Sequence, residues 1–167
     1  VNVVMYPQPS GERCLSLGKA IRRAVQQFDE DLDVQIWGTG GMSHQIQGAR
    51  AGLINLPWDI QFMDDLINQP EVLQYKPHLE YMIEAGSEGV ELIMWLIMRG
   101  ALTKKVKKLH QTYYLPSMTP IVSLILENDS SEGTGEAVDT YRERIGRELA
   151  GVEKLEGTYP FTLDRSV

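Results

Sequence analysis

An apolar strand, an amphipathic helix and a second apolar strand open this sequence, and the second strand leads directly into a cluster of glycines. The strands are predicted at Val1–Tyr6 and Val34–Trp37, and the helix at Glu12–Phe28. In a β-α-β unit, the loop after a strand lies at the carboxyl edge of the sheet, where ligands bind. This order predicts an α/β fold, with a mixed sheet flanked by helices and a functional loop at residues 38–45.

Further helices and a late pair of strands are predicted beyond this loop. Asp59 is expected to cap a helix that runs to about Asn68, and the prolines at positions 70 and 77 open short helical stretches. A strongly apolar helix is predicted at Gly89–Arg99. Two strands are predicted at Val106–Tyr114 and Ile121–Glu127, on either side of the turn sequence LPSMTP.

Charge and cysteine content exclude several classes of protein. The net charge of −7 argues against a nucleic-acid surface, and the one basic run, Lys104–Lys108, is interpreted as a solvated face. The single cysteine, Cys14, cannot form an internal disulfide and fits a reducing, cytoplasmic setting. No apolar stretch approaches the ~18 residues of a membrane span. No nucleic-acid or membrane partner is therefore expected.

Both ends of the sequence are expected to be internal to a longer protein. The first residue, Val1, already lies inside a strand pattern. The last residues, GTYPFTLDRSV, stop where a helix could begin.

The segment GTGGMSHQ at residues 38–45 is the most informative motif, because it places His44 on a glycine-rich turn after a strand. Glycine tolerates positive φ and lets a ligand come close, and histidine can move protons at neutral pH. The competing interpretation is a loop histidine bonded to backbone, and the residues alone leave both open. As a phosphate loop the segment is weak, since it lacks the Lys-Ser/Thr pair.

The other two histidines, His78 and His110, are interpreted as structural. Neither has another histidine or a cysteine two to four residues away. With one cysteine and no pair of histidines at helical spacing, a zinc site is not expected.

Three glutamates, Glu84, Glu88 and Glu91, lie around the break AGSEGVE. Glu88 precedes the apolar helix, where a carboxylate either caps the helix and interacts with its dipole or binds a metal ion. The residue pattern alone favours the cap.

Four separated blocks resemble the catalytic subunit of the class III extradiol dioxygenases. They are GTGGMSHQ, NLPWDIQFMDDL, GSEGVELIMWLIMRGAL and YYLPSMTPIVSLILEN, and they occur in order over roughly Asn2–Asn128. The match covers both sequence and spacing, which makes it specific. The resemblance implies a partial domain of that α/β fold and an enzyme that opens aromatic rings.

The resemblance also implies roles for individual residues. The family holds Fe(II) with two histidines and one glutamate, which leaves positions open for substrate and dioxygen. Glu88 is then the carboxylate ligand instead of a cap, and His44 is the acid/base that assists deprotonation of the catechol. The two histidine ligands belong to the amino-terminal part of the family sequence, and His78 and His110 do not match them.

Further implications concern the substrate and the oligomeric state. Ser43, Tyr114 and Thr119 are candidate substrate-binding residues from their positions in the matched blocks, with ordinary turn and strand hydrogen bonding as the competing interpretation. Because some substrate contacts in this family come from a neighbouring subunit, a homodimer is expected.

The end of the sequence narrows the subfamily. Leu149–Ser166 resembles the region that leads into the small α-subunit of two-subunit members, here on the same polypeptide. This fusion favours gallate over protocatechuate as the substrate. The predicted organisation is a carboxy-terminal portion of the catalytic domain at residues 1–128, a linker and helix at 129–150, and the start of an α-subunit-like segment at 151–167.

The implied reaction is Fe(II)-dependent extradiol (4,5) cleavage of gallate by the parent protein, with insertion of both atoms of O2. The isolated chain is predicted to bind iron poorly and to be inactive, because it carries one of three ligands. Two other hypotheses stay open: a non-catalytic module of the same fold, and a related enzyme that acts on an aminophenol or a non-aromatic compound.

Overall fold

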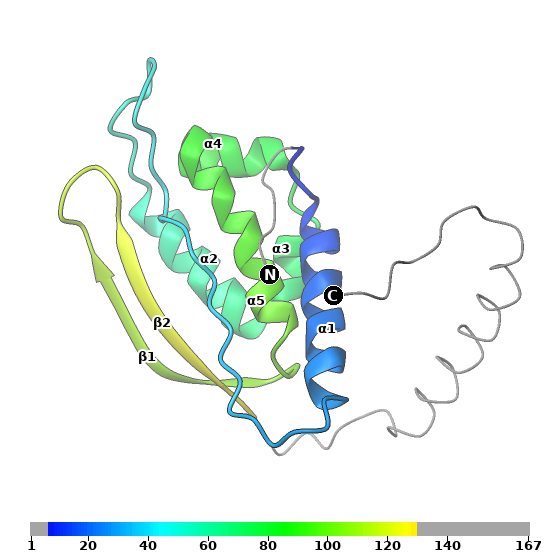
Figure 1. The fold of residues 1–167 in the computed structure, drawn as a ribbon. Coiled ribbons are helices and arrows are strands. Elements are labelled where there is room, and N and C mark those ends of the chain that lie inside the picture. The colour runs from blue at the N-terminus through cyan, green and yellow to red at the C-terminus, as the bar shows by residue number, and fades with distance from the viewer. Residues whose placement is uncertain (1–6, 130–167) are drawn as a thin grey trace, which may run out of the picture. The chain divides into compact units, whose positions relative to one another are not determined.

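The computed structural model describes residues 7–129, which all belong to the first of two compact units, Val1–Glu132 and Gly133–Val167. These residues form five α-helices, one 3-10 helix and two strands (Figure 1). In chain order they are α1 (Gly11–Gln26), α2 (Leu56–Asn68), α3 (Pro70–Gln74), α4 (His78–Gly89), η1 (Val90–Met94), α5 (Trp95–Gly100), β1 (Val106–Tyr114) and β2 (Ile121–Asn128).

The helices form one layer, and a β-hairpin lies beside it. Helix α1 packs against α5, whereas β1 contacts α2 on the opposite side (Figure 1). The hairpin is antiparallel, with Val106 opposite Asn128 and Tyr114 opposite Ile121, and a bulge interrupts its register at Leu109. Helices with a sheet confirm the predicted α/β class. Within residues 7–129 the sheet contains β1 and β2 only.

One predicted strand is wrong. Val34–Trp37 has irregular backbone, and the side chain of Trp37 is 81% exposed. A strand needs a partner for its backbone hydrogen bonds, and in the part of the chain that the structure describes β1 and β2 pair only with each other. The predicted strand Val1–Tyr6 lies outside the described residues, as do the helix predicted within residues 129–150 and the segment 151–167.

Two helix boundaries need correction. Helix α2 begins before Asp59: its N-cap is Asn55, whose side chain accepts a hydrogen bond from the Trp58 N–H at 3.3 Å. The predicted end at Asn68 is confirmed. The apolar segment Gly89–Arg99 is not one helix, because a 3-10 turn, η1, separates the end of α4 from α5.

The core is built from the apolar faces of the helices. Four aromatic rings meet there: Trp58 stacks on Phe62 at 5.3 Å between centroids, and Tyr81 and Trp95 approach Phe62 edge-on. The Tyr81 hydroxyl donates to the Leu73 carbonyl at 3.1 Å, so its polar end is satisfied inside the core.

Arg99 connects the end of α2 with the segment that follows α5 through hydrogen bonds to both. Its guanidinium is buried, and it donates to the carbonyls of Leu66 (2.7 Å) and Ile67 (3.3 Å) in the last turn of α2. It also donates to the carbonyls of Thr103 (2.8 Å) and Lys104 (2.7 Å). Carbonyls at a helix C-terminus lack intrahelical donors, and a cation there also interacts favourably with the helix dipole.

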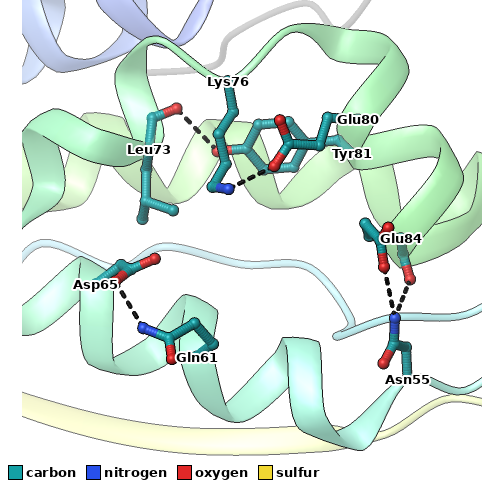
Figure 2. A network of polar contacts seen from close by, with 8 residues as sticks. All are labelled: Asn55, Gln61, Asp65, Leu73, Lys76, Glu80, Tyr81 and Glu84. Carbon is teal, nitrogen blue, oxygen red and sulfur yellow. Dashed lines mark hydrogen bonds and ion pairs between the residues drawn. The ribbon is translucent and has the colours of Figure 1, made fainter.

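A cavity of about 300 Å³ lies between α2 and the α3–α4 segment (Figure 2). Three carboxylates and one ammonium group are among its lining residues, which are Trp58, Gln61, Phe62, Asp65, Leu73, Lys76, Glu80 and Glu84. The lining therefore has a net negative charge and does not favour an anionic aromatic acid. Its polar groups pair with one another or with neighbours, as in the ion pair of Lys76 with Glu80 (Figure 2). None of the helices described is both long and apolar enough to cross a membrane.

Candidate active site

The glycine-rich segment is held by four consecutive backbone N–H groups, each of which donates to a different part of the fold. The N–H of Gly41 donates to Glu91 Oε1 (2.7 Å) in η1, and that of Met42 donates to the Pro120 carbonyl (3.1 Å) just before β2. The N–H of Ser43 donates to Asp59 Oδ1 (2.8 Å) in α2, and that of His44 donates to the Ala85 carbonyl (2.7 Å) in α4. The segment is therefore fixed without being part of a helix or strand.

His44 is buried, with 6% of its surface exposed, and its imidazole is oriented by its own loop. Nδ1 lies 2.7 Å from the Met42 carbonyl oxygen. A carbonyl oxygen can only accept, so this contact requires the proton on Nδ1. Nε2 has no hydrogen-bond partner within residues 7–129 and is then the nitrogen able to take up a proton. The prediction that His44 projects from a glycine loop as an acid/base is compatible with this geometry.

The His44 backbone contacts helix α4 at a kink in that helix. Gly86 has a φ of +90° and a non-helical backbone inside α4. A Cβ at this position would lie 2.2 Å from the His44 carbonyl oxygen, so only glycine lets the two backbones come this close. The interruption leaves the Ala85 carbonyl free to accept from the His44 N–H, and the Gly89 N–H donates to the His44 carbonyl at 3.4 Å.

Asp59 is a fully buried carboxylate directly behind the loop. It accepts from the Ser43 N–H and the Ser43 hydroxyl, both at 2.8 Å, and from the Tyr113 hydroxyl at 2.8 Å. Burial raises the pKa of Asp59 above its usual range, and the hydrogen bonds from Ser43 and Tyr113 oppose that shift. The sequence indicated Asp59 as a helix cap, and no local signal revealed these partners.

Two glutamates flank the loop. Glu88 Oε2 accepts from the Ser87 hydroxyl at 2.6 Å, and this hydrogen bond is the main reason why the pKa of Glu88 is lowered. The next residue, Gly89, donates its N–H to the His44 carbonyl, so Glu88 lies near the end of the loop. Glu91 lies at the start of the loop, where Gly41 holds one of its oxygens. Glu91 is one of the three glutamates around AGSEGVE, and the sequence alone indicated no role for it.

The three candidate substrate-binding residues have different surroundings. The Ser43 hydroxyl is fully buried and is used twice, as a donor to Asp59 and as an acceptor from the Asn55 N–H at 2.7 Å. Thr119 lies beside the loop, since a Cβ at Gly41 would be 2.6 Å from its Cγ2 and 3.1 Å from His44 Cε1.

Tyr114, the third candidate, lies at the end of β1 with its side chain 64% exposed. Successive residues of a strand point to opposite faces, and it is the neighbouring Tyr113 that points inward to Asp59. Of the three predicted residues, the fold brings Ser43 and Thr119 close to His44.

The remaining histidines lie apart from this loop. His78 Nε2 contacts the Pro9 carbonyl at 2.9 Å, as befits a structural residue, and His110 is exposed on β1. Within residues 7–129 no group of three or more His, Cys, Asp or Glu side chains could hold a metal ion. The described residues offer carboxylates beside a histidine, and they do not by themselves fit a complete iron site.

Comparison with known proteins agrees with the motifs and the loop. A family model described as the catalytic LigB subunit of aromatic ring-opening dioxygenase matches residues 1–124. A gallate dioxygenase of Pseudomonas putida is 48% identical over 166 residues, which are 99% of this chain and 49% of that protein. The chain thus spans about half the length of the curated relative it matches. By the extent of the family match, this chain belongs to the LigB family of catalytic subunits of aromatic ring-opening dioxygenases.

Proposed function

We propose that the protein to which this chain belongs cleaves the ring of gallate in the extradiol (4,5) mode, with Fe(II) as cofactor and both atoms of O2 inserted. The observation that carries the proposal is the buried His44 imidazole, with Nδ1 bound to Met42 and Nε2 free. Similarity to a gallate dioxygenase over nearly the whole chain supports gallate as the substrate. Protocatechuate, which lacks one of the three hydroxyl groups of gallate, is the alternative.

His44 supplies the proton chemistry in this proposal. Nε2 accepts the proton of a substrate hydroxyl and later returns a proton to an oxygen of the product. The imidazolium that forms keeps its Nδ1–H on the Met42 carbonyl, so the ring does not need to turn between the two steps.

The chain contributes a carboxylate to the iron site, and the two histidine ligands come from outside the described residues. Fe(II), when bound, supplies open positions for the catechol oxygens and for dioxygen. The family resemblance indicates Glu88 as the ligand. Glu91 is the stronger candidate by its surroundings, because the Gly41 N–H holds one of its oxygens in place, and ligating carboxylates are themselves hydrogen-bonded.

Substrate contacts are proposed at the hairpin turn. Thr119 lies beside Gly41 and near the His44 ring, so its hydroxyl is the best placed of the three candidates to bind the substrate carboxylate. Ser43 is a candidate for holding the loop, because its hydroxyl has two partners already. Tyr114 is exposed, and a substrate contact from it is compatible with the homodimer that the family resemblance implies. A cytoplasmic setting is proposed from the single, buried Cys14.

Oxygen uptake by the full-length protein tests the activity. Gallate, protocatechuate and 2-aminophenol are compared in parallel, with gallate expected to give the highest kcat/KM. His44→Ala should lower kcat by about 10²–10⁴-fold, with iron content near that of the wild type. His110→Ala, a histidine exposed on β1, is the matched control and should keep full activity. Unchanged turnover in His44→Ala would refute the acid/base role, and no uptake with any of the three compounds would favour a non-catalytic module.

Iron content separates the two glutamates. Glu91→Gln is expected to lose iron from the full-length protein, and Glu88→Gln is expected to retain it, since the amide keeps the volume but binds Fe(II) poorly. The reverse result would restore the role that the family resemblance gives to Glu88. The isolated 167-residue chain is expected to bind iron weakly, and stoichiometric tight binding by this chain alone would contradict that expectation.

A further inference from the structure

A chain of hydrogen bonds links the β-hairpin to the loop that carries His44. The Tyr113 hydroxyl in β1 donates to Asp59 Oδ2 at 2.8 Å, and the Ser43 hydroxyl donates to the same oxygen at 2.8 Å. The Ser43 N–H donates to Asp59 Oδ1 at 2.8 Å. Asp59 therefore holds the residue next to His44 through both its backbone and its side chain.

Within residues 7–129, every hydrogen-bond partner of the Asp59 side chain is a donor, which suits a carboxylate acceptor. Burying a charge is costly, and well-packed apolar side chains usually stabilise a fold as well as a buried polar group does. Stability alone gives no reason for a carboxylate at this point. The location of the carboxylate gives a reason, because Asp59 lies between the β-hairpin and the glycine-rich loop, which meet at His44.

The hairpin reaches the same loop a second time. The Met42 N–H donates to the Pro120 carbonyl at 3.1 Å, and Thr119 lies beside Gly41. Met42 is also the residue whose carbonyl holds His44 Nδ1. The position of the hairpin, the position of Ser43 and the orientation of the imidazole are thus set by one connected group of contacts.

We propose that Asp59 and Tyr113 are positioning residues for proton transfer by His44. They hold Ser43 against the hairpin. Because Met42 precedes Ser43, its carbonyl is held in place as well, and this carbonyl accepts from His44 Nδ1–H. The imidazole therefore keeps one orientation, with Nε2 pointing in one direction. Neither side chain is bonded to the imidazole itself. The inference rests on the proposed role of His44 and deepens it by naming what aligns the histidine.

The first test needs no activity. The chain contains three histidines, so labelling histidine with ¹⁵N gives a simple NMR spectrum of the 167-residue chain. The wild type should show His44 with its proton on Nδ1 and with slow exchange of that proton, and the signal is assigned by its loss in His44→Gln. In Tyr113→Phe and Asp59→Asn, exchange of this proton should be roughly tenfold faster or more, whereas the exposed Tyr75→Phe serves as control and should match the wild type.

The second test measures turnover by the full-length protein. Tyr113→Phe should lower kcat by roughly tenfold to a hundredfold, as expected for a misplaced reacting group, with KM within about twofold of the wild type. Asp59→Asn should do the same, and the double variant should be no slower than Asp59→Asn, because residues acting through one chain of contacts are not additive. Tyr113→Phe removes one hydroxyl only, so it carries the test if Asp59→Asn fails to fold.

The two tests separate this inference from the proposed function. If His44→Ala leaves turnover unchanged, the proposed acid/base role fails, and the exchange of the Nδ1 proton still decides whether Asp59 and Tyr113 orient the ring. Unchanged exchange in Tyr113→Phe would overturn the inference. So would losses of kcat that add in the double variant, or a loss that appears in KM alone.

Discussion

His44 has one imidazole nitrogen bound and the other free, and this asymmetry limits what the residue can do. The Met42 carbonyl requires the proton on Nδ1, so the proton exchange with a substrate that we propose would take place at Nε2. A loop histidine bonded to backbone was the competing interpretation of this residue. The two interpretations are compatible, because the backbone hydrogen bond uses one nitrogen and leaves the other for chemistry.

Cys14, in contrast, is a buried group that loses its proton less readily than an exposed thiol. It is 1% exposed, and burial raises the pKa of its thiol to about 11 from the ordinary value of 9.0. Between these two values the folded chain keeps the thiol proton while the unfolded chain loses it, so stability should fall as pH rises from 9 to 11. The slope is at most about 1.4 kcal/mol per pH unit. Denaturant midpoints measured across this range check it.

The matched variant for this pH dependence is Cys14→Ala. Its overall stability should be lower, because a buried side chain is truncated, but its stability should change less between pH 9 and 11 than that of the wild type. Equal slopes for the two proteins would show that the Cys14 thiol is not responsible. In the same way, a thiol reagent at pH 8 should label Cys14 only as fast as the chain unfolds.

At the scale of elements, α4 acts as a docking site for the loop through its interruption at Gly86. A regular helix would use the Ala85 carbonyl for its own hydrogen bonds, whereas here that carbonyl accepts from the His44 N–H. The kink also lets the His44 carbonyl come within reach of the Gly89 N–H. Helix irregularities at functional sites are a common means of aligning backbone groups.

Gly86→Ala tests this docking, with Gly52→Ala as its matched control. Both glycines have positive φ, +90° and +85°, but a Cβ at Gly52 meets no atom within 4 Å. Gly52→Ala should therefore cost roughly 1–2 kcal/mol, the strain of a left-handed alanine. Gly86→Ala adds a clash with the His44 carbonyl and should cost more than about 3 kcal/mol. Thermal or chemical unfolding measures both, and equal costs would mean that the loop moves aside easily.

At the scale of the whole molecule, local patterns predicted most helices and both described strands, and they did not predict the site. Helical spacing located α1, and the strand pattern placed β1 at Val106–Tyr114 as observed. The strand predicted at Val34–Trp37 was wrong, because a strand is stable only beside a paired neighbour, which no local pattern specifies.

The site depends on partners that are distant in sequence. Asp59 meets Tyr113, 54 positions away, and Gly41 meets Glu91, 50 positions away. Such pairs have no spacing rule, so they could not be read from the sequence. The glycine-rich motif indicated His44 and the family resemblance implied a role for it, but only the structure placed Glu91, Asp59 and Tyr113 around it.

The four consecutive N–H groups of Gly41–His44 have a consequence for heat inactivation. Their acceptors lie in η1, before β2, in α2 and in α4, so detachment of the loop breaks hydrogen bonds to four separate parts of the fold. Activity and helical circular dichroism should then be lost over the same temperature interval in the full-length protein, whereas a loop held at its ends alone would fail at lower temperature. Inactivation that clearly precedes the loss of helix signal would show a weaker attachment. For this fold, heat inactivation is therefore expected to coincide with unfolding.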